Sequence, residues 1–155
     1  MDNASARNLW GDFLDAHLEY AFVETPTVSH FCDNEKDANQ CAQLVLENKK
    51  KLTCHSLLGF QLREERLPRV GDFTIITDWN GAAQCIVKTT AVQLKPFFSI
   101  TEQEAILEGE GDLSLDYWKK VHLEYYTREL SPYKRKPQES MIVVCEQFEK
   151  VFEKK

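Results

Sequence analysis

The sequence lacks the features that mark a membrane-spanning or a secreted protein. None of its apolar runs approaches the roughly 20 residues that a bilayer-spanning helix needs. The first ten residues, MDNASARNLW, have no apolar stretch behind a basic start, so they do not read as a secretory signal. Internal repeats and low-complexity segments are also absent. We therefore expect a protein of the cytoplasm with no membrane partner.

Cysteine is scarce and scattered. The chain has five cysteines, none of which stands in a CxxC pair, and its four histidines do not cluster near them. An odd number of dispersed cysteines argues against a disulfide framework and is typical of a reducing compartment. The sequence therefore predicts neither a bound metal nor any other cofactor.

Positive charge is in deficit. The chain has 19 lysines and arginines against 25 aspartates and glutamates, which gives a net charge of -6. Proteins that grip long nucleic acid by its phosphates normally present a positive face. We therefore do not expect long double-stranded DNA as a partner, and the balance favours a small or short ligand. Nothing in the pattern indicates the oligomeric state.

The 155 residues, of which 43% are apolar, suffice for one domain with a real core. Because strands and helices are mixed rather than strictly alternating, the expected class is α+β. We expect a small, partly closed β-barrel with flanking helices, in which residues 1–29 form an extra helix and linker packed on a domain of residues 30–155. The expected helices cover 7–21, 34–48, 101–107 and 114–130, and the expected strands cover 73–77, 85–92 and 141–145, with a hairpin at Asn80-Gly81.

The stretch NKKKLTCH, residues 48–55, raises the main question about function. Three lysines at the end of a helix typically form a solvated terminus that suits the helix dipole. Here they run into threonine, cysteine and histidine, which are residue types that take part in chemistry. Lys50 and Thr53 are three residues apart and would face opposite ways on a regular strand. A turn at Asn48 would bring both to one cleft, because asparagine tolerates the left-handed conformation.

Two blocks of the sequence resemble the ASCH family, whose domains share a PUA-like barrel. The segment from Asn48 through Lys50 to Thr53 is similar to the family's Gly-x-Lys-x-x-Thr signature, with asparagine in place of glycine. The second block, EGEGDLSL at residues 108–115, resembles bacterial ASCH proteins described as RNA-binding. Further matching segments are LPxVGD at 67–72, DWxG at 78–81 and VVCE at 143–146. The resemblance covers residues 30–150 and implies a PUA-like fold.

The resemblance also implies a nucleoside or a short RNA as the ligand of a cleft. Some members of the family hydrolyse the amide of acetylated cytidine, which would make Thr53 the nucleophile, Lys50 its base and Glu108 a supporting residue. A nearby carboxylate raises the pKa of a lysine, so Glu108 fits better as a proton donor or a substrate orienter. The alternatives are a non-catalytic RNA-binding module, in which Lys50 and the basic loop 134–136 meet phosphate, and a ribonuclease using the same cleft.

Four more residues are candidates for ligand binding. Trp79, at the expected hairpin tip, could stack on a base, and Asp112 belongs to the acidic block. Trp118 and His122 lie one turn apart on the expected helix 114–130. Each also has a structural interpretation, as a turn aromatic, a helix cap or a packed helix face. Because neither Lys50 nor Thr53 belongs to the apolar pattern, we expect substitutions of either to change stability little.

Overall fold

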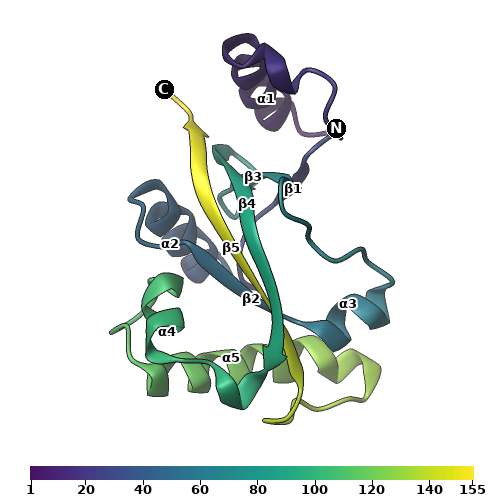
Figure 1. Ribbon diagram of the computed structural model, residues 1–155, viewed down its shortest axis with the longest axis vertical. Helices are drawn as coiled ribbons and strands as arrows, with labels where there is room; N and C mark the ends of the chain where they lie inside the picture. The colour runs from purple at the N-terminus through teal and green to yellow at the C-terminus, as the bar shows by residue number, and fades with distance from the viewer.

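Five strands form one curled sheet in the computed structural model, which describes residues 1–155 (Figure 1). The order across the sheet is β1-β3-β4-β5-β2, with β1 parallel to β3 and the other neighbours antiparallel. The hairpin predicted at Asn80-Gly81 is confirmed, because it joins β3 to β4. The strands are β1 (Thr27–Ser29), β2 (Leu52–Ser56), β3 (Phe73–Thr77), β4 (Ala83–Pro96) and β5 (Ile142–Glu153).

The curl of the sheet comes from its two longest strands. β4 and β5 run antiparallel, and their register shifts at Ile86/Val87 and again at Thr89/Ala91. A bulge of this kind bends the strand and increases its twist. The edge strands β1 and β2 do not pair with each other, so the sheet is a half-barrel with one open side. The predicted α+β class and partly closed barrel are confirmed.

Helices cover both ends of the half-barrel (Figure 1). Helix α1 (Ala4–Ala16) buries Leu9 and Phe13 against residues of β3 and β4, while α5 (Leu115–Leu130) packs Trp118 and Tyr126 into a second core cluster. The remaining α-helices are α2 (Glu35–Leu46), α3 (Leu57–Arg63) and α4 (Glu102–Glu108), with 3-10 turns at Leu18–Tyr20, Phe97–Ser99 and Ser131–Tyr133. None of the helices has the length and apolar character that crossing a bilayer requires.

Asn48 sets the direction in which the chain leaves α2. Its φ angle is 60°, which is the left-handed conformation predicted from the sequence. Directly after this turn, the backbone N–H groups of Lys49 and Lys50 both donate to the Leu44 carbonyl oxygen, at 2.9 and 3.1 Å. The prediction for Asn48 is confirmed.

We expect Asn48→Ala to lower the free energy of unfolding by about 1 kcal/mol, because alanine is strained at positive φ. Glycine adopts this conformation freely, so Asn48→Gly should be no less stable than the wild type. Urea denaturation of the two variants side by side measures the difference. Equal stability of the alanine and glycine variants would contradict the role given to this turn.

Candidate functional site

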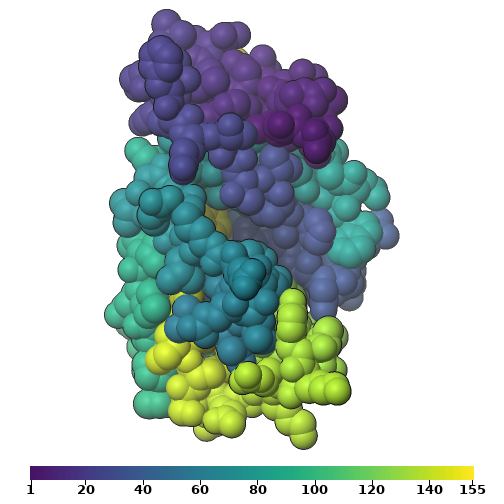
Figure 2. Space-filling view, turned by 90° about the vertical axis from the view of Figure 1, so that its right-hand side faces the viewer, coloured from purple at the N-terminus to yellow at the C-terminus, as the bar shows by residue number.

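The concave face of the half-barrel encloses a cavity of about 920 Å³. All five strands contribute to its lining, and α2, α5 and the loops before α2 and after α3 complete its walls. In Figure 2 the yellow atoms of β5 are visible at the bottom of a hollow, between the blue-purple and the teal segments. The volume lies in the upper part of the range of small-molecule sites. The cavity is thus large enough for an organic ligand and not merely a packing defect.

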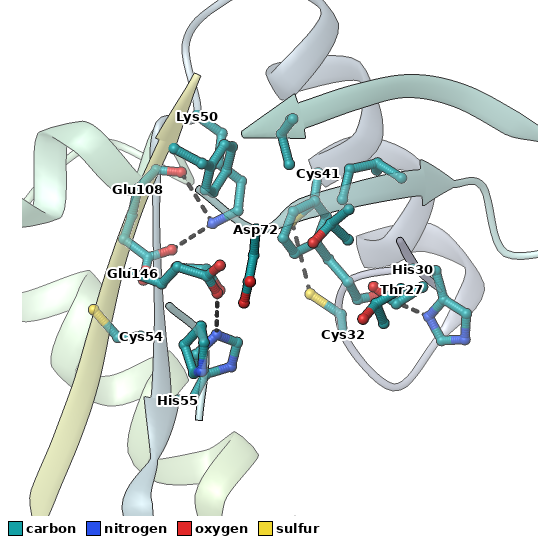
Figure 3. Close-up of a pocket in the computed structure, with 18 of the residues that line it drawn as sticks. Thr27, His30, Cys32, Cys41, Lys50, Cys54, His55, Asp72, Glu108 and Glu146 are labelled. Carbon is teal, nitrogen blue, oxygen red and sulfur yellow. Dashed lines mark hydrogen bonds and ion pairs between the residues drawn. The ribbon is translucent and has the colours of Figure 1, made fainter. Parts of the chain in front are cut away.

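Lys50 is buried in the wall of this cavity. Only 3% of its surface is exposed, whereas its neighbours Lys49 and Lys51 are exposed. Its Nζ atom donates to Glu108 Oε2 at 2.5 Å (Figure 3), to Glu110 Oε2 at 3.2 Å and to the Leu52 carbonyl oxygen at 3.0 Å. These bonds use the three protons of the ammonium group. Lys50 therefore has no donor left for a ligand.

Gly109 allows the two halves of this ion pair to meet. Its φ angle is +74°, and a β-carbon at this position would lie 2.6 Å from the Lys49 carbonyl oxygen. Only glycine therefore lets the end of α4 approach the start of β2 so closely. The approach is fixed further by a backbone hydrogen bond of 2.7 Å from the Lys51 N–H to the Leu107 carbonyl oxygen. The EGEG block places Glu108 and Glu110 against Lys50 for this reason.

The charges of this cluster determine the protonation states of Lys50 and Glu108. Burial would lower the pKa of the Lys50 amine, but the carboxylates of Glu108 and Glu110 outweigh that effect and raise the pKa. Burial would likewise raise the pKa of Glu108, yet the charges of Lys50 and His122 hold it well below its ordinary value of 4.5. At neutral pH the pair is an ammonium and a carboxylate. In this arrangement Lys50 does not accept a proton and Glu108 does not donate one.

One oxygen of the Glu108 carboxylate has no hydrogen-bond donor in the protein. Glu108 is 1% exposed and lines the cavity, and its Oε1 atom is buried without a partner. His122 Nε2 lies 3.2 Å from this oxygen, within the range of an ion pair, but its ring is not aligned to donate a hydrogen bond. An unsatisfied buried acceptor is rare because it costs free energy. The Glu108 carboxylate therefore carries an unpartnered hydrogen-bond acceptor at the wall of the cavity.

A second polar group lies on the neighbouring strands. Thr53 on β2 stands directly opposite Glu146 on β5, so their side chains emerge side by side into the cavity. Glu146 accepts a hydrogen bond from Thr89 Oγ1 at 2.6 Å, and it also pairs with His55 Nε2 at 2.9 Å, the contact drawn in Figure 3. These contacts hold the carboxylate beside Thr53. The site thus combines a half-buried hydroxyl with an oriented carboxylate.

Apart from the buried Lys50 ammonium, which is paired with Glu108 and Glu110, the fixed positive charge of the cavity lining is carried by arginines at its rim. Four arginines line it, and three of them carry ion pairs that fix them there: Arg63 with Glu129 at 3.0 Å, Arg66 with Asp72 at 3.0 Å and Arg128 with Asp33 at 2.6 Å. Arg69 is the fourth and lies 3.9 Å from Glu24. The cavity therefore has an acidic interior and an arginine-bearing mouth.

The family model of the ASCH domain matches residues 27–152. The chain belongs to the ASCH domain family. Two solved structures are similar along nearly its whole length. An ASCH domain of Lactobacillus crispatus JV V101 is 28% identical with a TM-score of 0.91, covering 96% of this chain and 94% of that one. The protein EF3133 of Enterococcus faecalis V583 is 33% identical with a TM-score of 0.87, covering 96% and 89%. No curated protein matches this ASCH domain.

The ASCH domain brings four of the predicted residues to one cavity, namely Lys50, Thr53, Glu108 and His122. The other three lie outside it, each for a structural reason. Trp118 is packed in the core, where it stacks on Phe97 and on the His122 ring. Asp112 is exposed and accepts a hydrogen bond from the Ser114 N–H before α5. Trp79 is on the hairpin, where its ring contacts His30 behind the cavity wall.

Sequence reasoning did not single out several residues that line the cavity. Glu110 and Glu146 stand inside segments that carried the family resemblance, so a signal for them was present. Cys32 and Cys41 gave no signal because eight residues separate them, which fits no common metal-binding spacing. Of the rim arginines, Arg66 and Arg69 lie in a loop with no periodic pattern, while Arg63 ends α3 and Arg128 stands in the last turn of α5. The ASCH domain therefore has a more polar site than its sequence indicates.

Proposed function

We propose that this ASCH domain binds a nucleobase that carries an N–H donor, presented as a nucleoside or by a short RNA. The observation that carries the proposal is the buried Glu108 Oε1 atom, which lacks a hydrogen-bond donor and belongs to a residue that lines the cavity. A carboxylate accepts strongly from the exocyclic amino group of a base, as acidic side chains do with cytosine. The family resemblance, which implies a cytidine-like ligand, agrees with this chemistry.

The rest of the cavity suits such a ligand. Six aromatic side chains line it, and aromatic faces stack on bases with little regard to sequence. They are Phe31, Phe60, Phe73, Tyr117, Tyr125 and Phe148. A phosphate attached to the nucleoside would meet the rim arginines and not Lys50, whose donors are occupied. The basic loop 134–136, offered from the sequence as a phosphate contact, does not line the cavity.

Three cytidines that differ only at the amino nitrogen test the proposal. Cytidine and N4-methylcytidine keep an N–H group, whereas N4,N4-dimethylcytidine has none. We expect the dimethyl compound to bind at least about tenfold more weakly than the monomethyl compound, because Glu108 would stay buried without a donor. Isothermal titration calorimetry measures the three affinities, and the monomethyl compound controls for added bulk. Equal affinity for all three, or no binding of cytidine, would reject the proposal.

The same geometry supports hydrolysis of an acyl group on that amino nitrogen. Thr53 Oγ would attack the acyl carbonyl carbon while its proton passes to Glu146, the carboxylate opposite it. Cleavage of the C–N bond then releases the amine, which takes up a proton, and leaves an acyl ester on Thr53. Water hydrolyses this ester to a carboxylic acid and restores the hydroxyl. Lys50 takes no proton in this scheme, because its raised pKa keeps it charged.

A further inference from the structure

Two cysteines face each other in the wall of the cavity, at the start of α2. Cys32 lies in the loop before the helix and is half-buried, and Cys41 lies within the helix and is buried. Their Sγ atoms are 3.7 Å apart, as the dashed line in Figure 3 marks. Cys32 has a φ angle of 64°, an uncommon conformation for a residue other than glycine. Backbone strain of this kind is often retained where a side chain has a function.

A carboxylate completes the group. Glu110 Oε1 lies 3.2 Å from Cys41 Sγ, and one ligand atom from each of the three residues falls within 4.8 Å of the others. Two thiolates on one tetrahedral Zn²⁺ are about 3.8 Å apart, and a thiolate and a carboxylate oxygen are about 3.5 Å apart. The observed 3.7 and 3.2 Å are close to these two values. Two of the three ligand-to-ligand distances thus already match those around a tetrahedral zinc ion, and the third lies within 4.8 Å.

We propose that Cys32, Cys41 and Glu110 bind one Zn²⁺ ion, whose fourth position opens into the cavity. Three protein ligands with one open position is the pattern of zinc sites that also bind water or a ligand. All three residues line the cavity, which gives the ion its entry path and the open position its direction. Binding releases the two thiol protons to solvent. This proposal departs from the sequence-based expectation of no metal.

Lys50 supplies the outer contact that such a site needs. Its ammonium donates to Glu110 Oε2 at 3.2 Å, leaving Glu110 Oε1 directed at Cys41. Partners of this kind orient a metal-binding carboxylate. Two thiolates and a carboxylate around a divalent ion leave one net negative charge, which the ammonium offsets. The residues around the proposed ion are therefore arranged to favour it.

Two other clusters of potential ligands are less suited to an ion. Glu108, Glu110 and His122 also lie close together, but the Lys50 ammonium already bonds to both carboxylates there. Cys54 and Cys145 lie 3.6 Å apart on neighbouring strands, yet no third ligand joins them to make a metal-binding group. Cys145 therefore serves as a matched control, because it is a paired, buried cysteine outside the proposed site.

Cobalt binding tests the proposal, since tetrahedral Co²⁺ bound to thiolates gives intense visible and charge-transfer absorption. Reduced, chelator-treated protein is titrated with Co²⁺ and then with Zn²⁺ as a competitor. We expect one Co²⁺ per chain, displaced by one Zn²⁺. Cys32→Ser should weaken zinc binding at least about a hundredfold, since losing a ligand costs no less than losing an outer contact. Cys145→Ala should bind like the wild type.

Each outcome decides the proposal. No thiolate–cobalt absorption from the wild type, or unchanged absorption from Cys32→Ser, would overturn it. Cys32 is only half-buried, so its serine variant is expected to fold, and circular dichroism checks this. Glu110→Gln, with both thiols intact, should retain cobalt absorption but with weaker binding. Cytidine binding is measured separately, so failure of the metal site leaves the proposed nucleobase site open to its own test.

Discussion

Lys50→Met is expected to lower the free energy of unfolding by about 3–5 kcal/mol. The substitution removes the cation from a carboxylate that is 1% exposed, and an uncompensated buried charge is costly. This result would reverse the sequence-based expectation that Lys50 contributes little to stability. Urea denaturation at neutral pH measures the effect. Lys49→Met is the matched control, because the Lys49 side chain is 65% exposed and pairs only with Glu47.

The pH dependence separates charge from packing in this experiment. Lys50 holds the pKa of Glu108 well below its ordinary value of 4.5. The stability that this pair contributes is therefore complete above pH 4.5 and lost as the pH falls through the lowered pKa. The difference in unfolding free energy between the wild type and Lys50→Met should therefore become smaller as the pH is lowered. A gap as small as that of Lys49→Met at neutral pH would contradict the buried ion pair.

Thr53→Ala is expected to reduce hydrolysis of N4-acetylcytidine about a thousandfold or more, while leaving the affinity for cytidine nearly unchanged. Removing a nucleophile stops the covalent step, whereas the proposed contact with the base is made by Glu108. Thr53 is half-buried and outside the apolar core, so the variant should fold. The rate is measured at saturating substrate by using chromatography to monitor the release of cytidine.

Two controls accompany this measurement. Thr53→Ser keeps a hydroxyl at the same place and should retain part of the activity. Thr90→Ala removes an exposed threonine of β4 and should have no effect. Full turnover by Thr53→Ala would rule out the nucleophile assignment. Absence of turnover by the wild type would leave the domain as a binding module, with the nucleobase proposal judged by its own titration.

Local patterns account for the parts of the fold that were predicted. Strand β3 has the bounds expected from the sequence, since a β-branched run ahead of Asn80-Gly81 leaves little choice. The left-handed conformation of Asn48 was predicted because the apolar stripe of α2 ends there. The meeting of Lys50 with Glu108 was anticipated from two blocks of a family resemblance. Neither block would have indicated that contact by itself.

The parts that could not be predicted depend on distant partners. Three consecutive lysines look alike in the sequence, and only the approach of residues 108–110 makes Lys50 the buried one. Strand β2 follows directly on those lysines, so in the sequence its start resembles the end of the preceding helix. In the structure its side chains alternate as in a strand, with Leu52 and Cys54 buried and their neighbours more exposed. Trp118 was an ambiguous candidate because helical spacing does not say which face of α5 meets the core.

The pairing of β2 with β5 has a consequence for how the domain matures during synthesis. Thr53 on β2 stands opposite Glu146 on β5, so residues from early and late in the chain make the wall of the cavity together. The ribosome releases residues 50–56 long before the strand that they need. Contacts between residues so far apart in the sequence form slowly, and β2 has an unpaired edge until β5 is available. A nascent chain therefore has no complete cavity until β5, which supplies Glu146 and Phe148 to the wall, has emerged.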